Sequence, residues 1–311
     1  MEKDKDSPSC TSQARNSASF AGGGFMAIYH VGMRQAVQEC SSKLGREIFS
    51  GTLYGASVGS VVATSIACGI SHLEMLEFIH ELYNIAESIC QWGRFSLLHP
   101  KLRLGKKCRD HLEKLLPSDA HRRCTGRVGV SVTIFPSMEN WIITDFNTRG
   151  ELIQALLCSC FVPFVSGIMM PKLRGKYCCD GGLSSNLPHN TDPSVITVSP
   201  FTGECDICPP ADNESYYQCY FFGQTLNMNT GNTYRGMGSL LLLPWKEMEI
   251  IYKQGYTDAV NFLRKEGILT HNLVASHLPV KATPSSDEET MSDYGSMTTP
   301  NHSRQSSETS A

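Results

Sequence analysis

The sequence predicts an α/β fold built on a central, mostly parallel sheet. Short apolar runs alternate along the chain with longer runs of helical periodicity, as expected of parallel strands joined by crossover helices. Of the 311 residues, 41% are hydrophobic and 18% are charged, which is the balance of an ordinary globular domain. No repeat with a period of about 20 to 50 residues is visible, which argues against a solenoid or a propeller. Length and composition therefore favour one folded domain with tails.

Strands and helices are expected in a regular order. Apolar runs of strand length occupy residues 18–21, 49–54, 127–134, 141–144 and 195–199. Helical runs occupy residues 28–40, 60–67, 73–90, 151–158 and 245–264. Gly69 provides a stop after the second of these helices, and a further short strand is expected immediately before Asp180.

Three consecutive glycines, Gly22, Gly23 and Gly24, follow the first expected strand and precede the first helix. Such a loop presents backbone N–H groups where they can stabilise negative charge on a carbonyl oxygen, so it predicts an oxyanion hole. With Ala27, the same residues also fit the G-x-G-x-x-A pattern of dinucleotide-binding oxidoreductases. That alternative requires an acidic residue at the end of the second strand. Here the strand ends in Gly55-Ala56-Ser57, which disfavours it.

Residues 55–59 form a G-x-S-x-G pentapeptide between an expected strand and an expected helix. This is how a serine nucleophile is presented on a sharp strand-to-helix turn. Ser57 is expected to adopt a strained backbone conformation, and Gly55 and Gly59 are expected to form the nucleophile elbow by letting the flanking backbones pass each other. The pattern predicts a serine esterase with Ser57 as its nucleophile.

Asp180-Gly181-Gly182 follows the short strand that begins at Lys176. A lone Asp-Gly-Gly is usually a turn. The order of glycine loop, G-x-S-x-G and Asp-Gly-Gly, however, resembles that of the patatin-like phospholipases. Residues 150–164, 180–188 and 196–209 are similar to the animal branch of this family, which contains adipose triglyceride lipase and adiponutrin. The resemblance covers about residues 16–270.

The resemblance implies a three-layer α/β/α patatin-like fold and a serine lipid acyl hydrolase. Ser57 would be the nucleophile and Asp180 the proton acceptor of a Ser-Asp dyad, and no metal or cofactor would be needed. A carboxylate with a pKa of about 3.9 is a weak base, so burial has to raise the pKa of Asp180. The candidate apolar neighbours are Phe161, Val162, Phe164 and Tyr177.

The implied substrates and partners are lipids. The branch suggests a triacylglycerol lipase, with transacylation as a second outcome, whereas phospholipids and retinyl esters are alternative substrates. A lipid droplet or membrane surface and a protein co-activator would be the partners. Members that bind lipid without turnover usually lack the serine or the aspartate, and both are present. Met26 stands where plant and bacterial relatives carry Lys or Arg, whereas Ala27 departs from the glycine that is usual in the branch.

A Ser-His-Asp triad is the main alternative within catalysis. His189 is the nearest histidine after Asp180, and His271 and His277 lie in the downstream position used by α/β-hydrolases. A lone histidine is more often a surface or structural residue. The family resemblance therefore favours the dyad over the triad.

Charge and cysteine usage limit the partners and the location. The formal net charge of −3 argues against nucleic acid as a general partner. The charged N-terminus lacks the apolar region of a secretory signal, and no run of about 18 apolar residues predicts a membrane span. The 13 cysteines follow no disulfide framework, and Cys205-x-x-Cys208 lacks a second pair at zinc spacing. We expect a cytoplasmic protein, peripherally associated with membranes or lipid droplets.

Two kinds of segment are candidates for contact with lipid. The apolar runs 161–171 and 240–245 form either an acyl groove or lip, or part of the core. A basic cluster beside the helical run 110–116 forms either a patch for anionic headgroups or a solvated helix face. The cluster consists of Lys101, Arg103, Lys106, Lys107 and Arg109.

The expected domain organisation is a disordered segment at residues 1–15, a patatin-like phospholipase domain at 16–270 and a disordered Ser/Thr-rich tail at 271–311. The tail has almost no large apolar side chains, so burial cannot offset the entropy lost on ordering it.

Overall fold

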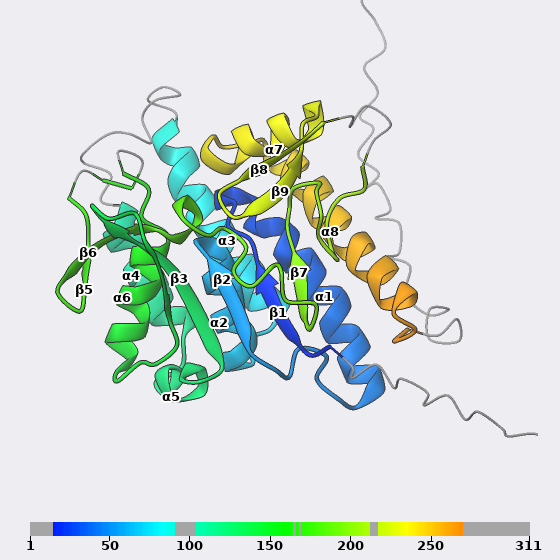
Figure 1. Cartoon of the computed structure of the whole chain (residues 1–311), viewed down its shortest axis with the longest axis horizontal. Helices are drawn as coiled ribbons and strands as arrows, with labels where there is room; N and C mark the ends of the chain where they lie inside the picture. The colour runs from blue at the N-terminus through cyan, green and yellow to red at the C-terminus, as the bar shows by residue number, and fades with distance from the viewer. Residues whose placement is uncertain (1–14, 91–103, 164–165, 168, 212–216, 270–311) are drawn as a thin grey trace, which may run out of the picture. The chain divides into compact units, whose positions relative to one another are not determined.

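The computed structural model describes residues 15–90, 104–163, 166–167, 169–211 and 217–269 (Figure 1). All of them belong to one compact unit, Met1–Leu273. The segments expected to be disordered, residues 1–15 and 271–311, lie outside the described residues apart from Arg15. That expectation and the domain boundaries stay predictions.

A seven-stranded sheet forms the centre of the unit (Figure 1). Its strands are β1 Ser17–Phe20, β2 Leu53–Ala56, β3 Val128–Phe135, β4 Asn140–Ile143, β5 Lys172–Leu173, β6 Lys176–Asp180 and β7 Val195–Val198. The order is β5-β6-β3-β2-β1-β7, and β4 pairs with β3. Strands β3, β2, β1 and β7 run parallel, whereas β4 and β6 pair with β3, and β5 with β6, in antiparallel fashion. The predicted α/β fold with a mostly parallel central sheet is confirmed.

Helices follow the strands in the expected alternation. They are α1 Ala27–Leu44, α2 Val58–Cys68, α3 His72–Cys90, α4 Leu104–Leu115, α5 Ala120–Cys124, α6 Arg149–Ser159, α7 Thr230–Leu240 and α8 Trp245–Lys265. Helix α2 packs on β1, β2 and β3, and α6 packs on β3 and β6. A separate antiparallel hairpin, β8 Gln218–Phe221 and β9 Gln224–Asn227, precedes α7.

Helices α1 and α8 lie against each other with their backbones in close contact. A Cβ atom at Gly32 would lie 1.9 Å from the carbonyl oxygen of Tyr252, and one at Gly255 would lie 2.0 Å from that of Tyr29. Only glycine permits this approach. The buried Tyr29 hydroxyl also donates to Asp258 Oδ2 across 2.8 Å, which fixes the crossing.

The second strand differs from its sequence prediction. Residues 49–54 were expected to be extended, but β2 begins at Leu53 and continues to Ala56. Ile48 and Phe49 are buried in the core from a turn that precedes the strand. The sequence prediction failed here because a short apolar run indicates that residues are buried, but does not by itself show that they form a strand. The short strand β5, the hairpin β8–β9 and helices α5 and α7 had no sequence prediction.

Candidate active site

Ser57 lies on the turn between β2 and α2, where the backbone is forced into an unusual conformation. Its φ is +52°, a region that non-glycine residues rarely occupy. A Cβ atom at Gly55 would lie 2.4 Å from the carbonyl carbon of Gly59, and one at Gly59 would lie 2.2 Å from the carbonyl oxygen of Phe20. The close backbone passage and the strained serine expected from the pentapeptide are therefore present.

Hydrogen bonds hold Ser57 from three sides. Its Oγ donates to Asp180 Oδ2 across 2.7 Å, and its backbone N–H donates to Ser159 Oγ across 2.8 Å. Ser159 Oγ in turn donates to the carbonyl oxygen of Ser131 in β3. Ser60 Oγ donates to the Ser57 carbonyl oxygen across 2.6 Å. Ser57 is 9% exposed and has little freedom to move.

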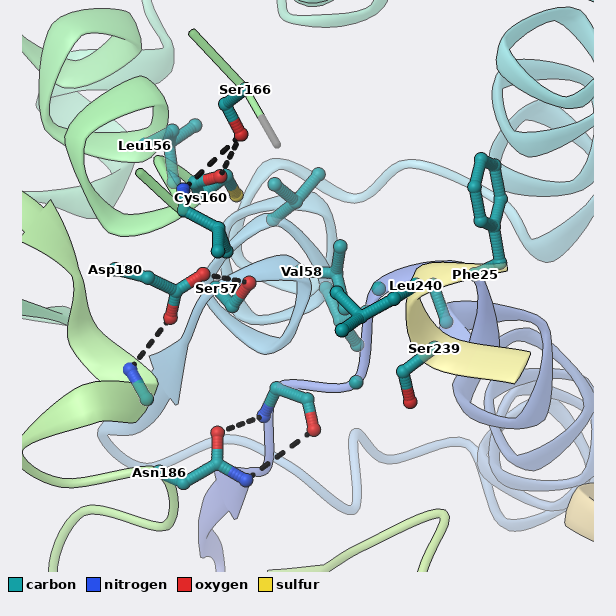
Figure 2. A pocket seen from close by; sticks show the side chains of 18 of the residues that line it. Phe25, Ser57, Val58, Leu156, Cys160, Ser166, Asp180, Asn186, Ser239 and Leu240 are labelled. Carbon is teal, nitrogen blue, oxygen red and sulfur yellow. Dashed lines mark hydrogen bonds between the residues drawn. The ribbon is translucent and has the colours of Figure 1, made fainter. Parts of the chain in front are cut away.

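The register of the sheet brings Asp180 level with Ser57. Ala56 pairs with Ser131, and Asp180 pairs with Val132, the next residue along the same edge of β3. The opposite edge of β3 is occupied by β4, which pairs with both Ser131 and Val132. Strands β2 and β6 therefore end facing each other beside the middle of β3, and the side chains of Ser57 and Asp180 meet there (Figure 2). The family resemblance implied that Ser57 and Asp180 act together, but their spacing in the sequence did not, because the contact depends on β6 pairing with β3.

Burial controls the ionisation of Asp180. The residue is 5% exposed. Burial raises the pKa of its carboxyl from the ordinary 3.8 to about 6, although hydrogen bonds from Ser57 and from the Gly182 N–H act in the opposite direction. Of the expected apolar neighbours, Val162 lines the same cavity, and the Phe161 carbonyl accepts the Asp180 N–H. Tyr177 is exposed instead, and Phe164 lies outside the described residues.

The glycine loop lies directly against Ser57. A Cβ atom at Gly22 would lie 2.8 Å from Ser57 Cβ, and one at Gly24 would lie 1.9 Å from the Ser239 carbonyl oxygen. Gly22 was expected to be one of the oxyanion donors. Its N–H instead donates to Asn186 Oδ1 across 3.0 Å, so this N–H is not free to bind an oxyanion. The N–H groups of Gly23, Gly24 and Val58 have no hydrogen-bond partner among the described residues, which leaves these donors available.

Asn186 connects the motifs and was not singled out from the sequence. Its Oδ1 accepts from the Gly22 N–H, its Nδ2 donates to the Gly22 carbonyl oxygen across 3.4 Å, and its backbone N–H donates to the Phe222 carbonyl oxygen across 2.7 Å. Figure 2 shows its side chain reaching the glycine loop. The only sequence signal was its place shortly after Asp-Gly-Gly.

A cavity of about 520 Å³ opens beside Ser57 and Asp180. Its walls are largely apolar side chains from α2, α3, α4 and α6, including Val61, Met75, Ile79, Leu112 and Leu156. Cys160 also lines it, and burial raises the pKa of this thiol well above its usual range. A volume of this size and composition suits an acyl chain.

The two apolar runs divide between cavity and core. Val162 and Ser166 of the first run line the cavity, as does Leu240 of the second. Leu242, Leu243 and Trp245 pack on the core instead. Both interpretations offered by the sequence therefore apply, each to part of a run.

Of the histidines of the alternative triad, His189 does not line this cavity. His189 is exposed, and its ring lies 4.2 Å from the ring of Tyr54. No histidine is among the described residues that line the cavity. His271 and His277 lie outside the described residues.

The remaining candidates are a metal site, a membrane span and the basic cluster. Within the described ranges, no group of three or more metal-binding side chains is found. Among the described helices, none combines the length and the apolar character that a membrane span requires. On α4, Lys106 and Lys107 are exposed, whereas Arg109 donates to Gln154. Lys101 and Arg103 lie outside the described residues.

Comparisons with known proteins give one family. The sequence model of the patatin-like phospholipases matches residues 18–191. The human 1-acylglycerol-3-phosphate O-acyltransferase PNPLA3 is 36% identical over 81% of this chain and 51% of its own length. The rat patatin-like phospholipase domain-containing protein 2 is 38% identical over 87% of this chain and 55% of its own length. The human patatin-like phospholipase domain-containing protein 5 is 35% identical over 82% of this chain and 58% of its own length.

The chain spans about half the length of the curated relatives that it matches. Among solved structures, VipD from Legionella pneumophila is similar with a TM-score of 0.47 and 15% identity, over 82% of this chain and 67% of its own.

Proposed function

Because the chain belongs to the patatin-like phospholipase family, we propose that it is a lipid acyl hydrolase in which Ser57 and Asp180 form the catalytic dyad. The observation that carries the proposal is the 2.7 Å hydrogen bond between Ser57 Oγ and Asp180 Oδ2 at the wall of an apolar cavity. A nucleophile within hydrogen-bond reach of a base is the arrangement that acyl transfer requires.

The acylation step uses this hydrogen bond. Asp180 takes the hydroxyl proton as Ser57 Oγ forms a bond to the ester carbonyl carbon, and the electron pair of the C=O bond moves onto oxygen. The N–H groups of Gly23, Gly24 and Val58 would stabilise that oxyanion. When the intermediate collapses, the C–O bond to the alcohol breaks, and the alcohol leaves with the proton held by Asp180.

Deacylation repeats these steps with a new nucleophile. Asp180 takes a proton from water or from a second alcohol, whose oxygen attacks the acyl-enzyme carbonyl carbon. Ser57 Oγ leaves and regains the proton. Water gives a free fatty acid and an alcohol gives a new ester, so the acceptor decides between hydrolysis and transacylation.

The raised pKa of Asp180 suits its role as base. At a pKa of about 6 the carboxyl is still largely ionised at neutral pH, but it holds a proton more strongly than an exposed aspartate does. A base is most effective when its pKa lies near the working pH.

Neutral acylglycerols fit the cavity better than phospholipids. Among the described residues that line it, Asp180 is the only charged one, and no Lys, Arg or His is available to pair with a phosphate. Phosphate groups in proteins are frequently held by Arg or Lys side chains. We therefore propose acylglycerols as the substrates, with phospholipids and retinyl esters as the competing outcomes.

Acyl transfer to an alcohol is a second candidate activity. The human relative at 36% identity carries the name of an O-acyltransferase. The same acyl-enzyme would serve both reactions. The partners that follow are a lipid ester and the surface of a lipid droplet or membrane, at which a cytoplasmic protein would act peripherally. A protein co-activator remains an expectation from the family resemblance.

The experiment that tests the proposal is incubation of the purified chain with a mixed lipid extract. We expect triacylglycerol or diacylglycerol to be consumed, with acyl chains recovered as free acid or on a new alcohol. Ser57→Ala is the control, since it removes the nucleophile. Consumption of phospholipid alone would contradict the substrate class, and equal turnover by Ser57→Ala would contradict the mechanism.

A further inference from the structure

The segment from Tyr217 to Trp245 is almost free of charge. Arg235 is its only charged residue. The segment contains the β8–β9 hairpin and α7, which lie together in Figure 1. Exposed elements normally carry charged side chains on their outer face. An exposed segment without them calls for an explanation.

Large apolar side chains occupy the outer face of this segment. We call them the apolar rim: Tyr220, Phe221 and Phe222 of the hairpin, and Met237, Leu240 and Leu241 at the end of α7. Each is between 41% and 73% exposed. Met237 and Leu240 are three residues apart on α7, so they share one side of the helix, and Leu241 follows directly after the helix ends.

The rim is continuous with the mouth of the cavity. Phe221, Phe222 and Leu240 are exposed and also line the cavity that contains Ser57. Figure 2 shows Leu240 on the side of the cavity opposite Asp180. A lipid chain that enters the cavity here passes the rim first.

The hairpin turn holds an aromatic residue at an energetic cost. Phe222 and Gly223 are its two central residues, with φ of +51° and +76°. Such turns favour Asn or Gly at the first position, and a bulky residue there is strained. Two hydrogen bonds from the segment after Asp180 hold the turn in place. The Phe222 carbonyl accepts from the Asn186 N–H, and the Gly223 carbonyl accepts from Asn190 Nδ2. Strain that is retained in this way is common at functional positions.

We propose that the apolar rim docks on the surface of a neutral or zwitterionic lipid phase and passes the ester from it into the cavity. This inference rests on the proposed function, since it explains how a water-insoluble substrate reaches Ser57. The rim lacks the cations that would attract an anionic surface, so apolar burial has to supply the attraction. The tyrosine and phenylalanine rings suit the boundary between headgroups and acyl chains.

A lipid surface fits the rim better than a protein does. Phe221, Phe222 and Leu240 are exposed and line the cavity, so a protein seated on the rim would cover this side of it. A lipid surface keeps this side open and contains the substrate itself. Phosphatidylcholine vesicles are therefore the probe for this surface.

The test uses rim residues that do not line the cavity. The variant Tyr220→Ser/Met237→Gln/Leu241→Gln replaces three exposed apolar side chains and leaves the cavity walls unchanged. Its matched control, Leu73→Gln/Met138→Gln/Ile250→Gln, replaces three exposed apolar side chains elsewhere. Flotation with phosphatidylcholine vesicles measures binding, with Ser57→Ala added to each chain to prevent turnover. Hydrolysis of a water-soluble short-chain ester is measured in the same chains with Ser57 intact.

The rim variant is expected to bind vesicles about a thousandfold more weakly, because each of the three apolar side chains buried in lipid changes the partition constant by roughly tenfold. The control variant is expected to bind as the parent chain does, and 0.5 M salt should not weaken parent binding. Both variants should hydrolyse the soluble ester at the parent rate.

Two results overturn the inference. One is vesicle binding by the rim variant equal to that of the control variant. The other is a parent chain that does not bind neutral vesicles at all, which would assign the rim to a protein partner. A parent chain that hydrolyses no ester but shows rim-dependent vesicle binding would instead contradict the proposed function and leave this inference supported.

Discussion

The residues around Ser57 and the apolar rim bound the same cavity, yet they are built in opposite ways. Ser57 and Asp180 are 9% and 5% exposed. Ser159 Oγ accepts from the Ser57 N–H and Ser60 Oγ donates to the Ser57 carbonyl oxygen, and these two bonds hold the serine in place. The rim side chains are 41% to 73% exposed, and hydrogen bonds reach the hairpin turn through backbone carbonyls. One region fixes polar atoms, whereas the other fixes only the backbone.

This difference separates two requirements of the proposed reaction. Acyl transfer depends on atoms held within a few tenths of an ångström, because small displacements greatly reduce the rate. Docking on a lipid surface depends on apolar area and tolerates rearranged side chains. Changes around Ser57 should therefore affect turnover without affecting lipid binding, and changes at the rim should do the reverse.

The largest effect is expected for the dyad itself. Ser57→Ala removes the nucleophile, and Asp180→Asn keeps the size of the side chain but cannot accept the proton. Each should lower the kcat of a soluble ester by at least about a thousandfold, and the double variant should be no worse than either single variant. Vesicle flotation should be unchanged in all three.

His189→Gln is the control for the dyad, because His189 packs on Tyr54 away from the cavity lining. It should retain most of the activity. A loss of several orders of magnitude in His189→Gln, with folding and vesicle binding intact, would replace the dyad by a triad.

Asn186 joins the two regions, so an intermediate effect is expected for it. It holds Gly22 through its side chain and the turn residue Phe222 through its backbone N–H. Asn186→Ala keeps the backbone contact but releases the glycine loop, and should lower kcat about ten- to a hundredfold with little change in KM. As a positioning residue, it should leave the pH dependence of the remaining activity unchanged.

Asn190→Ala provides a matched control for Asn186. Asn190 Nδ2 donates to the Gly223 carbonyl and makes no contact with the glycine loop among the hydrogen bonds of the described residues. Its kcat should stay within about twofold of the parent, since the oxyanion donors are untouched. Equal losses in the two variants would mean that the hairpin, rather than the glycine loop, is responsible.

Most of the fold was predictable, because its strands and helices carry clear periodic patterns. Ser57 and its two glycines were identified from local sequence, since a strained turn with close backbone passage has a short signature. Asn186 and Ser159 were not identified, because their roles depend on contacts across the sheet. The hairpin part of the rim was also missed, whereas Leu240 and Leu241 belong to a run for which the sequence offered a groove or lip as one of two interpretations. An uncharged exposed hairpin and an uncharged buried strand have similar sequences, and only the structure shows which one is exposed.

The ionisation of Asp180 gives a third prediction, for activity against pH. Because its pKa is raised to about 6, activity on a soluble ester should fall about tenfold for each pH unit below 6. The acid limb should persist in His189→Gln. A limb centred near pH 4 would mean that Asp180 is not the titrating base.

The same shift predicts a stability effect whose sign follows from proton binding. Between about pH 4 and pH 6 the folded chain holds a proton on Asp180 that the unfolded chain releases, so this contribution to stability is lost as the pH rises through 6. A rise of the pKa from 3.8 to about 6 corresponds to about 3 kcal/mol. The melting temperature of Asp180→Asn minus that of the parent should therefore be larger at pH 7.5 than at pH 4. A difference that does not change with pH would contradict the burial of the charge.

The smallest effect is expected for the basic cluster, which belongs to neither region. Lys106 and Lys107 are exposed on α4, and neither lines the cavity. Lys106→Gln/Lys107→Gln should change binding to neutral phosphatidylcholine vesicles by less than about twofold, because no headgroup charge is present for them to attract. If the cluster faces the lipid surface, the same variant would bind more weakly than the parent chain to vesicles with anionic lipid. Salt would remove this difference, since exposed charges are screened within about 10 Å at 0.1 M. A loss on neutral vesicles larger than that of the rim variant would reverse the comparison, because lipid contact would then be centred on α4 instead of on the mouth of the cavity.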